Sequence, residues 1–345
     1  MKKTEFGRTL AGEQTTLYTF ENAGGMKMSV TDYGATLVRV LVPGENGELL
    51  DVVLGHDEAA GYETGKGSLG ATVGRNGNRI GGASFSLNGR TYSLAKNDNG
   101  ANNLHSGPDY YFTRLWEIEN VTESGVTFRL FSPDGDQGFP GNFDVTVTYT
   151  LTEQNEVRIE YNGKSDADTI VNMTNHSYFN LDGHGSGSIL AHEVWLDADG
   201  YTRVDQELIP TGEILPVAGT PMDLRRAKRI GRDIETDCEA LAFGGGYDHN
   251  WTLKNNGAFA HVATLTGAVS GIHMDVSTDL PGVQMYVGNF LDHEPGKDGV
   301  YYEKRQGVCF ETQYFPDAIH HENFKSPVLK ANEPYHTVTA YRFYR

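Results

Sequence analysis

Alternating apolar and polar residues run through most of this chain and predict many short β-strands. The alternation is clearest over residues 143–151, Phe-Asp-Val-Thr-Val-Thr-Tyr-Thr-Leu, where every second side chain is apolar. Successive side chains of a strand point to opposite faces of a sheet, so this stretch is typical of a half-buried antiparallel strand. The same pattern predicts strands at residues 27–31, 126–131, 157–161, 261–265, 272–276 and 338–343.

Turn and helix signals complete the expected fold. Asn88-Gly89 predicts a hairpin that joins residues 83–87 to residues 90–94. Helical periodicity is scarce: a short helix is expected at residues 224–235 and one turn at residues 57–62. With 42 glycines and 12 prolines spread along the chain, the pattern favours an all-β fold, a large antiparallel β-sandwich with few short helices. We expect residues 1–345 to form a single domain, because all-β folds often run long as one unit.

Charge and composition exclude several classes of partner. Lysine and arginine total 28 against 46 aspartate and glutamate residues, a formal net charge of -18. This balance repels phosphate backbones and anionic lipid surfaces, so neither nucleic acid nor a membrane is an expected partner. The first residues, 1–7, are not followed by the apolar segment of a secretory signal, which predicts a cytoplasmic protein. Cys238 and Cys309 are too few for a disulfide framework and are predicted to be free thiols.

The first candidate for chemistry is Glu311, within Gly-Val-Cys-Phe-Glu-Thr-Gln-Tyr-Phe-Pro-Asp at residues 307–317. The apolar residues before it indicate a strand, and Pro316 ends that strand a few residues later. Glutamate is almost never fully buried without a partner. Its position therefore predicts either an ion pair or a catalytic base.

Two histidines and an Asn-Arg pair are further candidates for binding or catalysis. Asn78 and Arg79 belong to Gly-Arg-Asn-Gly-Asn-Arg-Ile, which has neither the GxGxxG nor the GxxxxGK spacing of a nucleotide loop. They suit hydrogen bonds to neutral or partly charged oxygens, although an arginine that only ties down a loop is an open alternative. His105 and His176 each follow an apolar stretch, without the spacing of a metal site, and a structural role for either also stays open.

An acid and an amide complete the candidate constellation. Residues 246–251 place Asp248 in a turn flanked by aromatic residues, and residues 281–287 place Gln284 on a strand. Sugar hydroxyls need paired donors and acceptors, and the C–H face of a sugar packs against an apolar wall. Acid, amide, arginine and aromatic side chains together therefore predict a carbohydrate site.

These segments, in this order, resemble the aldose 1-epimerases, the galactose mutarotase family. The resemblance runs from about residue 34 to residue 343. It is carried by the ordered set Gly-Arg-x-x-Asn-Arg-Ile, Asn-x-Leu-His, Asn-His-Ser-Tyr-Phe-Asn-Leu, Tyr-Asp-His-Asn, Pro-Gly-x-Gln and Glu-Thr-Gln-x-Phe-Pro-Asp. The resemblance implies a supersandwich of antiparallel sheets and an enzyme that interconverts the α and β anomers of an aldohexose such as D-galactose or D-glucose.

The resemblance also implies roles for individual residues. Glu311 matches the general base and His176 the general acid of the family. The positions that match its sugar-binding residues are Asn78, Arg79, His105, Asp248 and Gln284, with Tyr178 in the same binding segment. Only protons move in the implied reaction, so neither a cofactor nor a metal is expected. The expected partner is a small aldose, bound by a monomer or homodimer, and the product anomer would feed a sugar kinase or another stereospecific enzyme of galactose use.

The chain departs from the family's usual sequence at Gly77, Ser106 and residues 108–112. These changes leave the acid and base in place but leave the preferred aldose open.

Three other functions also stay open. Epimerisation of a hexose 6-phosphate would need cations at the rim of the site, which Arg75, Arg79 and Arg114 are candidates to supply. A non-catalytic carbohydrate-binding module would keep the sugar ligands but has no need of an acid and base pair. Glycoside hydrolysis normally uses two carboxylates across the scissile bond, whereas the motifs supply a carboxylate and a histidine.

Overall fold

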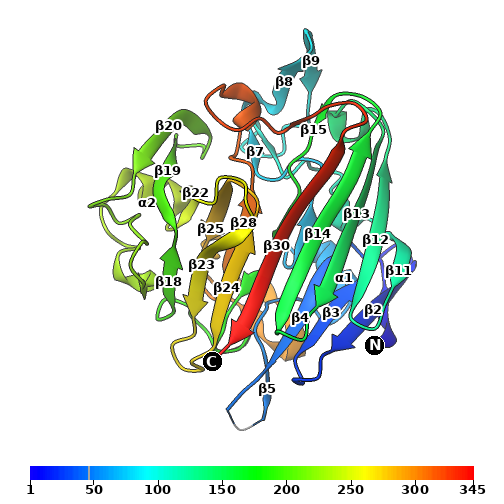
Figure 1. Cartoon of the computed structure of the whole chain (residues 1–345), viewed down its shortest axis with the longest axis vertical. Coiled ribbons are helices and arrows are strands. Elements are labelled where there is room, and N and C mark those ends of the chain that lie inside the picture. The colour runs from blue at the N-terminus through cyan, green and yellow to red at the C-terminus, as the bar shows by residue number, and fades with distance from the viewer. Residues whose placement is uncertain (46) are drawn as a thin grey trace.

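The computed structural model describes residues 1–45 and 47–345, and most of the regular structure in these ranges is β-strand (Figure 1). A nine-stranded antiparallel sheet crosses the described part of the molecule. Its strands, in order across the sheet, are β11 (Glu117–Val121), β12 (Gly125–Ser132), β13 (Phe143–Leu151), β14 (Glu156–Ser165), β30 (Pro334–Tyr344), β24 (His273–Thr278), β23 (Ala260–Thr266), β18 (Glu193–Leu196) and β21 (Lys228–Arg229).

Two further antiparallel sheets are formed by other segments of the described ranges. The six-stranded sheet has the order β17 (Tyr178–Phe179), β28 (Val308–Gln313), β25 (Gly282–Tyr286), β22 (Asp248–Leu253), β19 (Ala198–Val204) and β20 (Pro210–Pro216). The five-stranded sheet has the order β1 (Lys2–Arg8), β2 (Gln14–Glu21), β3 (Lys27–Thr31), β4 (Thr36–Pro43) and β5 (Leu49–Asp51).

Short strand pairs and turns connect these sheets. The pairs are β7 (Arg79–Ile80) with β10 (Asn103–Leu104), β6 (Ala71–Val73) with β16 (Thr174–His176), β8 (Ser84–Leu87) with β9 (Arg90–Ser93), β15 (Thr169–Ile170) with β29 (Val328–Leu329), and β26 (Glu294–Pro295) with β27 (Tyr301–Tyr302). The helical segments are α1 (Ala59–Thr64), α2 (Glu239–Gly244), and the 3-10 turns η1 (Gly81–Ala83), η2 (Tyr111–Thr113), η3 (Asp136–Gly138), η4 (Ile230–Arg232), η5 (Lys297–Gly299) and η6 (Ala318–His320).

The core lies between the nine-stranded sheet and the other two sheets, which confirms the predicted β-sandwich. Along β13 every second residue is buried, as the alternation predicts. Val147 of β13 shares one apolar cluster with Val30 of β3 and with Phe310 of β28. Across the same core, the hydroxyl of Tyr341 on β30 donates to the backbone oxygen of Phe310 at 3.0 Å. Each such buried side chain contributes about 1.5–3 kcal/mol, so the sandwich is held by many comparable contacts.

Most of the predicted elements are confirmed. The strands at residues 27–31 and 143–151 have the predicted bounds, and Asn88-Gly89 joins β8 to β9. The turn expected at residues 57–62 is helix α1, which begins two residues later than expected. No helix in the described ranges combines the length and the apolar character needed to cross a membrane. Cys238 and Cys309 are both free.

The helix predicted at residues 224–235 is wrong. The segment forms β21 and the turn η4, and α2 begins only at Glu239. Its backbone pairs with another strand: Lys228 lies opposite Val194 of β18, and the N–H of Ile230 donates to the oxygen of His192. The side chain of Lys228 is buried and donates to Asp233 at 2.6 Å. Long-range pairing has therefore replaced the local hydrogen bonds of a helix.

Candidate active site

Neighbouring strands of the six-stranded sheet carry a row of side chains across one face. Tyr178 on β17 pairs with Cys309 on β28, Cys309 with Tyr286 on β25, and Tyr286 with Asp248 on β22. Directly paired residues of antiparallel strands project from the same face. Glu311, two residues beyond Cys309, projects from that face as well. The register of the sheet thus gathers side chains that are far apart in the sequence.

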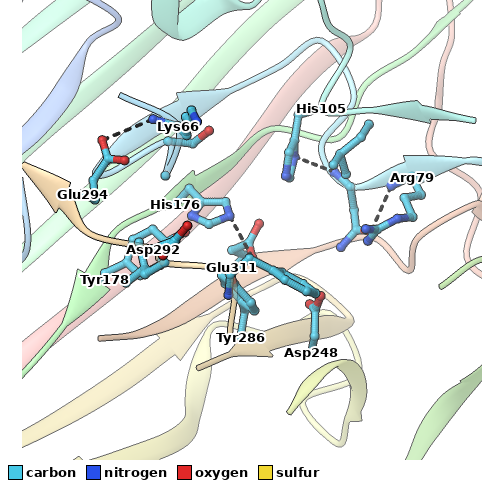
Figure 2. A pocket seen from close by; sticks show the side chains of 16 residues that line it. Lys66, Arg79, His105, His176, Tyr178, Asp248, Tyr286, Asp292, Glu294 and Glu311 are labelled. Carbon is cyan, nitrogen blue, oxygen red and sulfur yellow. Dashed lines mark hydrogen bonds and ion pairs between the residues drawn. The ribbon is translucent and has the colours of Figure 1, made fainter. Parts of the chain in front are cut away.

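This face forms one wall of a cavity of about 370 Å³, shown in Figure 2. The volume lies within the range of small-molecule sites. The structure brings to this cavity all but one of the residues that the sequence singled out, namely Asn78, Arg79, His105, His176, Tyr178, Asp248 and Glu311.

The exception is Gln284, which is not among the residues that line the cavity. It is buried between Glu311 and Asn250, its partners on the adjacent strands. Its Nε2 donates to Oδ1 of Asp248 at 2.7 Å. The structure therefore places Gln284 beside a cavity-lining carboxylate, where it supports Asp248.

Asp248 does not lie in a turn, which corrects the sequence expectation. It is the first residue of β22, and the turn comes just before it at Gly245 and Gly246, both with positive φ. A Cβ on Gly246 would lie 2.5 Å from Oδ1 of Asn289, so a side chain has no room there. This tight turn delivers Asp248 to the edge of the cavity at the start of its strand.

His105 is held by the backbone of Asn78 on the opposite wall. Both residues have positive φ and flank the paired strands β7 and β10. The backbone N–H of His105 donates to the oxygen of Asn78 at 3.0 Å, and the N–H of Asn78 donates to Nδ1 of His105 at 3.1 Å. Burial, with the charges of His176 and Arg79, lowers the His105 pKa well below its usual value. The ring is therefore neutral, with its hydrogen on Nε2 because Nδ1 accepts.

Arg79 is oriented by a carboxylate outside the cavity. Its Nε donates to Oδ2 of Asp98 at 3.0 Å. Among the described residues, Nη1 and Nη2 have no hydrogen-bond partner, so both can donate to a ligand oxygen. The guanidinium also lowers the pKa of Glu311, although less than burial raises it.

The other two arginines considered for phosphate binding do not line the cavity. Arg75 is fully buried, and it donates to the backbone oxygens of Pro140 and Gly141 and to Ser132. Arg114 pairs with Asp136 at 2.8 Å and with a second aspartate. Both are structural, which removes two of the cations that a phosphate site was expected to use.

Glu311 and His176 lie side by side in the cavity. Oε1 of Glu311 is 3.5 Å from Nε2 of His176, and Glu311 is only 2% exposed. Its Oε2 has no hydrogen-bond partner among the described residues. Burial, and then the charge of Asp248, raise the pKa of Glu311 well above its usual value. Burial lowers the pKa of His176 to about 4. The base candidate is therefore a buried carboxyl group with one oxygen still to be satisfied.

His105, His176 and Glu311 also have ligand atoms within 4.8 Å of one another, close enough to suggest a metal site. A histidine that binds a metal usually donates its other ring N–H to an acceptor. Nδ1 of His105 instead accepts an N–H from Asn78, which places the hydrogen on Nε2, where a metal would need a lone pair. This donor set fits hydrogen bonding to a ligand better than it fits a metal ion.

Part of the cavity wall was not predicted. The additional lining residues with functional side chains are Lys66, Ser68, Tyr286, Phe290, Asp292 and Glu294. Tyr286 lies two residues after Gln284 on the same strand, so alternation was a signal for it. Its ring stacks on that of Phe290, which is 65% exposed. Glu294 accepts a hydrogen bond from the backbone N–H of Lys66 at 3.2 Å (Figure 2). Apart from Tyr286, the additional lining residues come from sequence segments in which apolar and polar residues do not alternate.

The chain is similar to known proteins in both sequence and fold. The family described as "Aldose 1-epimerase" matches residues 16–342. The chain is 41% identical over 319 residues to a galactose mutarotase from Bos taurus, covering 92% of this chain and 91% of that protein. It is 40% identical over 331 residues to an aldose 1-epimerase from Haemophilus influenzae, covering 95% of each. A solved structure of a GalM/aldose epimerase homologue from C. elegans superimposes with a TM-score of 0.89 at 29% identity, covering 96% of this chain and 99% of that one.

Proposed function

The chain belongs to the aldose 1-epimerase family, and we propose that it is a mutarotase that interconverts the α and β anomers of a neutral aldohexose such as galactose or glucose. The family makes it an isomerase. The observation that supports the proposal most strongly is the buried pair formed by Glu311 and His176, in a cavity that donors and acceptors suited to sugar hydroxyls also line.

The proton affinities of this pair suit a reversible exchange. In water the pKa of a histidine lies about two units above that of a glutamate. Burial raises the pKa of Glu311 and lowers that of His176, so the usual order of the two proton affinities is reversed and the proton of the pair lies on Glu311. Transfer of that proton from Glu311 to Nε2 of His176, 3.5 Å away, gives the carboxylate and the imidazolium, and the two groups titrate as a coupled pair. An epimerase needs this property, because each residue must reverse its role within one turnover.

Ring opening uses the pair in one direction. Glu311, ionised, takes the proton of the anomeric hydroxyl, while His176, protonated, gives its proton to the ring oxygen. The C1–O5 bond breaks and leaves the open-chain aldehyde. Rotation about C1–C2 then presents the other face of the carbonyl.

Ring closure returns both protons. His176 takes the proton from the C5 hydroxyl as its oxygen attacks C1, and Glu311 gives its proton to the former carbonyl oxygen. The product is the opposite anomer, and both residues are back in their starting states. Arg79, with its free Nη groups, and His105, with Nε2–H, are positioned to donate to oxygens on which charge develops. Asn78, Tyr178 and Asp248 line the remaining wall as sugar ligands, and we assign Gln284 the support of Asp248.

The charges of the cavity favour a neutral sugar over a sugar phosphate. The cavity is lined by Asp292, Glu294 and Asp248 as well as by Lys66. Two of the arginines considered for phosphate are engaged elsewhere in the structure. A dianionic phosphate would meet more carboxylates than free cations here.

Three broader properties belong to the same proposal. The cavity draws residues from position 66 to position 311, and the nine-stranded sheet includes β11 and β30, which supports residues 1–345 as a single domain. Two free thiols are in keeping with a reducing, cytoplasmic setting. The partner is the aldose, taken up by a monomer or a homodimer.

Polarimetry tests the proposal directly. Freshly dissolved α-D-galactose, α-D-glucose and α-D-glucose 6-phosphate should each be followed with and without the protein. We expect faster relaxation to the same final rotation for a neutral aldose, and a much weaker effect on the phosphate. Faster relaxation for the phosphate alone would replace the neutral substrate with a phosphorylated one. Binding of a sugar without any acceleration would identify a carbohydrate-binding module.

A further inference from the structure

The imidazole of His176 is bracketed by two side chains of one strand. Nε2 lies 3.5 Å from Oε1 of Glu311, and Nδ1 lies 3.5 Å from Sγ of Cys309. Cys309 and Glu311 are two residues apart on β28, so both project from the same face of the sheet. Cys309 is fully buried. Two side chains of one strand therefore lie beside the two ring nitrogens of the proposed acid.

The sulfur is the only side-chain hydrogen-bond partner of Nδ1 within the described ranges. The other titratable groups in contact with the ring are His105, Tyr178 and Tyr286, whose rings pack against it. In the proposed reaction Nε2 takes up a proton in each turnover, so in the neutral ring the hydrogen lies on Nδ1, where the sulfur of Cys309 can accept it.

We propose that Cys309 is a positioning residue for His176: its sulfur accepts the Nδ1 hydrogen, which fixes the ring and leaves Nε2 as the nitrogen that gives and takes the catalytic proton. The proposal rests on the mutarotase function proposed above. It assigns to an uncharged thiol the place that a carboxylate occupies beside many catalytic histidines.

The thiol of Cys309 is uncharged, and this affects the pKa of His176. A carboxylate at Nδ1 would stabilise the imidazolium and raise the pKa of His176. Burial and nearby carboxylates raise the Cys309 pKa well above its usual value, so the thiol stays neutral. The ring is thus oriented without being locked in its protonated form, which suits a proton that must leave and return in each turnover.

Variants of the cysteines test this role in kinetics. For Cys309→Ala we expect kcat to fall about tenfold, a fraction of what a proton-transfer group itself contributes, with KM changed by less than about twofold. Cys309→Ser should recover most of kcat, because a hydroxyl oxygen accepts the same hydrogen. Cys238→Ala, which removes the other thiol, should match the wild type. An unchanged kcat for Cys309→Ala, or no recovery in Cys309→Ser, would overturn the proposal.

The tautomer of His176 gives a second, independent readout. Nitrogen NMR of the unliganded, 15N-histidine-labelled protein should show His176 with its hydrogen on Nδ1, with the signal assigned by its loss in His176→Gln. In Cys309→Ala the two tautomers should become mixed. A hydrogen on Nε2 in the neutral wild-type ring would refute the hydrogen bond, whether or not the variants fold. If the wild type does not accelerate mutarotation, the proposed function fails, but this measurement still decides whether sulfur accepts the Nδ1 hydrogen.

Discussion

Two buried carboxyl groups of this chain, Asp51 and Glu311, lie in opposite electrostatic situations. Asp51 is 7% exposed, and its Oδ2 accepts from Lys297 at 2.7 Å and from Arg39 at 3.1 Å. Its Oδ1 accepts backbone N–H groups as well. Glu311 is 2% exposed, has His176 at 3.5 Å and leaves one oxygen without a partner among the described residues.

The protein itself supplies the hydrogen bonds and opposite charges that Asp51 needs. It leaves an oxygen of Glu311 available to a ligand. A buried charge is tolerated where opposite charges and hydrogen bonds surround it. Around Asp51 these partners are complete, and the cluster has no need of a substrate. Around Glu311 they are incomplete, and burial, with the nearby charge of Asp248, raises its pKa well above the usual value. Perturbed and unsatisfied groups of this kind concentrate at functional sites.

Replacement of Glu311, the carboxyl group with incomplete partners, should have the greatest effect on activity. Glu311→Gln should lower kcat by about 10²–10⁴-fold, because the amide cannot take the anomeric proton. The free energy of unfolding should stay the same or rise, since the variant buries no ionisable group at this position. Polarimetry with galactose measures the first effect and urea denaturation the second. Activity close to wild type would show that Glu311 is not the base.

The next prediction concerns Asp51, the carboxylate whose partners are complete. Lys297→Met removes the closest cation from a buried carboxylate and should lower the free energy of unfolding by about 3–5 kcal/mol. The double variant Lys297→Met/Asp51→Asn should recover part of this loss, because no unpaired charge remains. The kcat of the folded fraction should not change in either variant. A loss of kcat at equal stability would mean that this cluster acts on the active site.

A third buried carboxylate, Asp248, lies between the two extremes, with one side-chain donor in Gln284. Gln284→Met should raise KM for galactose about tenfold, since the loss of a hydrogen bond to a charged group costs on the order of 1.5 kcal/mol. The effect on kcat should be smaller, because the acid and base remain. Steady-state kinetics checks this split. A fall in kcat with KM unchanged would assign Gln284 to the transition state instead.

The last prediction concerns the pH dependence of stability, to which several buried histidines contribute. Burial lowers the pKa of His56, His176 and His249 to about 4 each. Between the usual value of about 6.5 and that value, the unfolded chain binds protons that the folded chain does not. The histidines should therefore lower the free energy of unfolding as the pH falls from 6.5 to 5, by up to about 1.4 kcal/mol per pH unit for each ring. Glu311, whose pKa burial raises, acts in the opposite direction and reduces the net slope.

The variant His176→Gln isolates the contribution of His176 to this pH dependence. Urea midpoints measured at several pH values should show a shallower slope for the variant than for the wild type, because one of the contributing rings is gone. His261→Gln is a suitable control, because this exposed ring hydrogen-bonds at the surface, away from the cavity. Equal slopes for the wild type and His176→Gln would mean that His176 is not neutral in the folded protein.

Much of the site could be predicted because its residues stand in local patterns. Glu311 interrupts an apolar strand, and His176 and Asp248 each lie at the end of a strand. Lys66 and Phe290 could not be found in this way, because both lie outside strands and helices and no periodicity marks them. Nor could the sequence show that the guanidinium of Arg75 donates its hydrogen bonds to backbone oxygens that are distant in sequence.

The strands, the hairpin at Asn88-Gly89 and the family could be predicted from the sequence, because alternation, turn chemistry and motif order are properties of neighbouring residues. The partner of each polar group, in contrast, depends on the folded arrangement of the chain. Residues 224–235 form a strand and a turn because β18 offers backbone partners, and Gln284 supports Asp248 because the register of β22 and β25 brings them together. Lys297 meets Asp51 across 246 residues of sequence. Pairings of this kind depend on how sheets pack, and packing is a property of the whole chain.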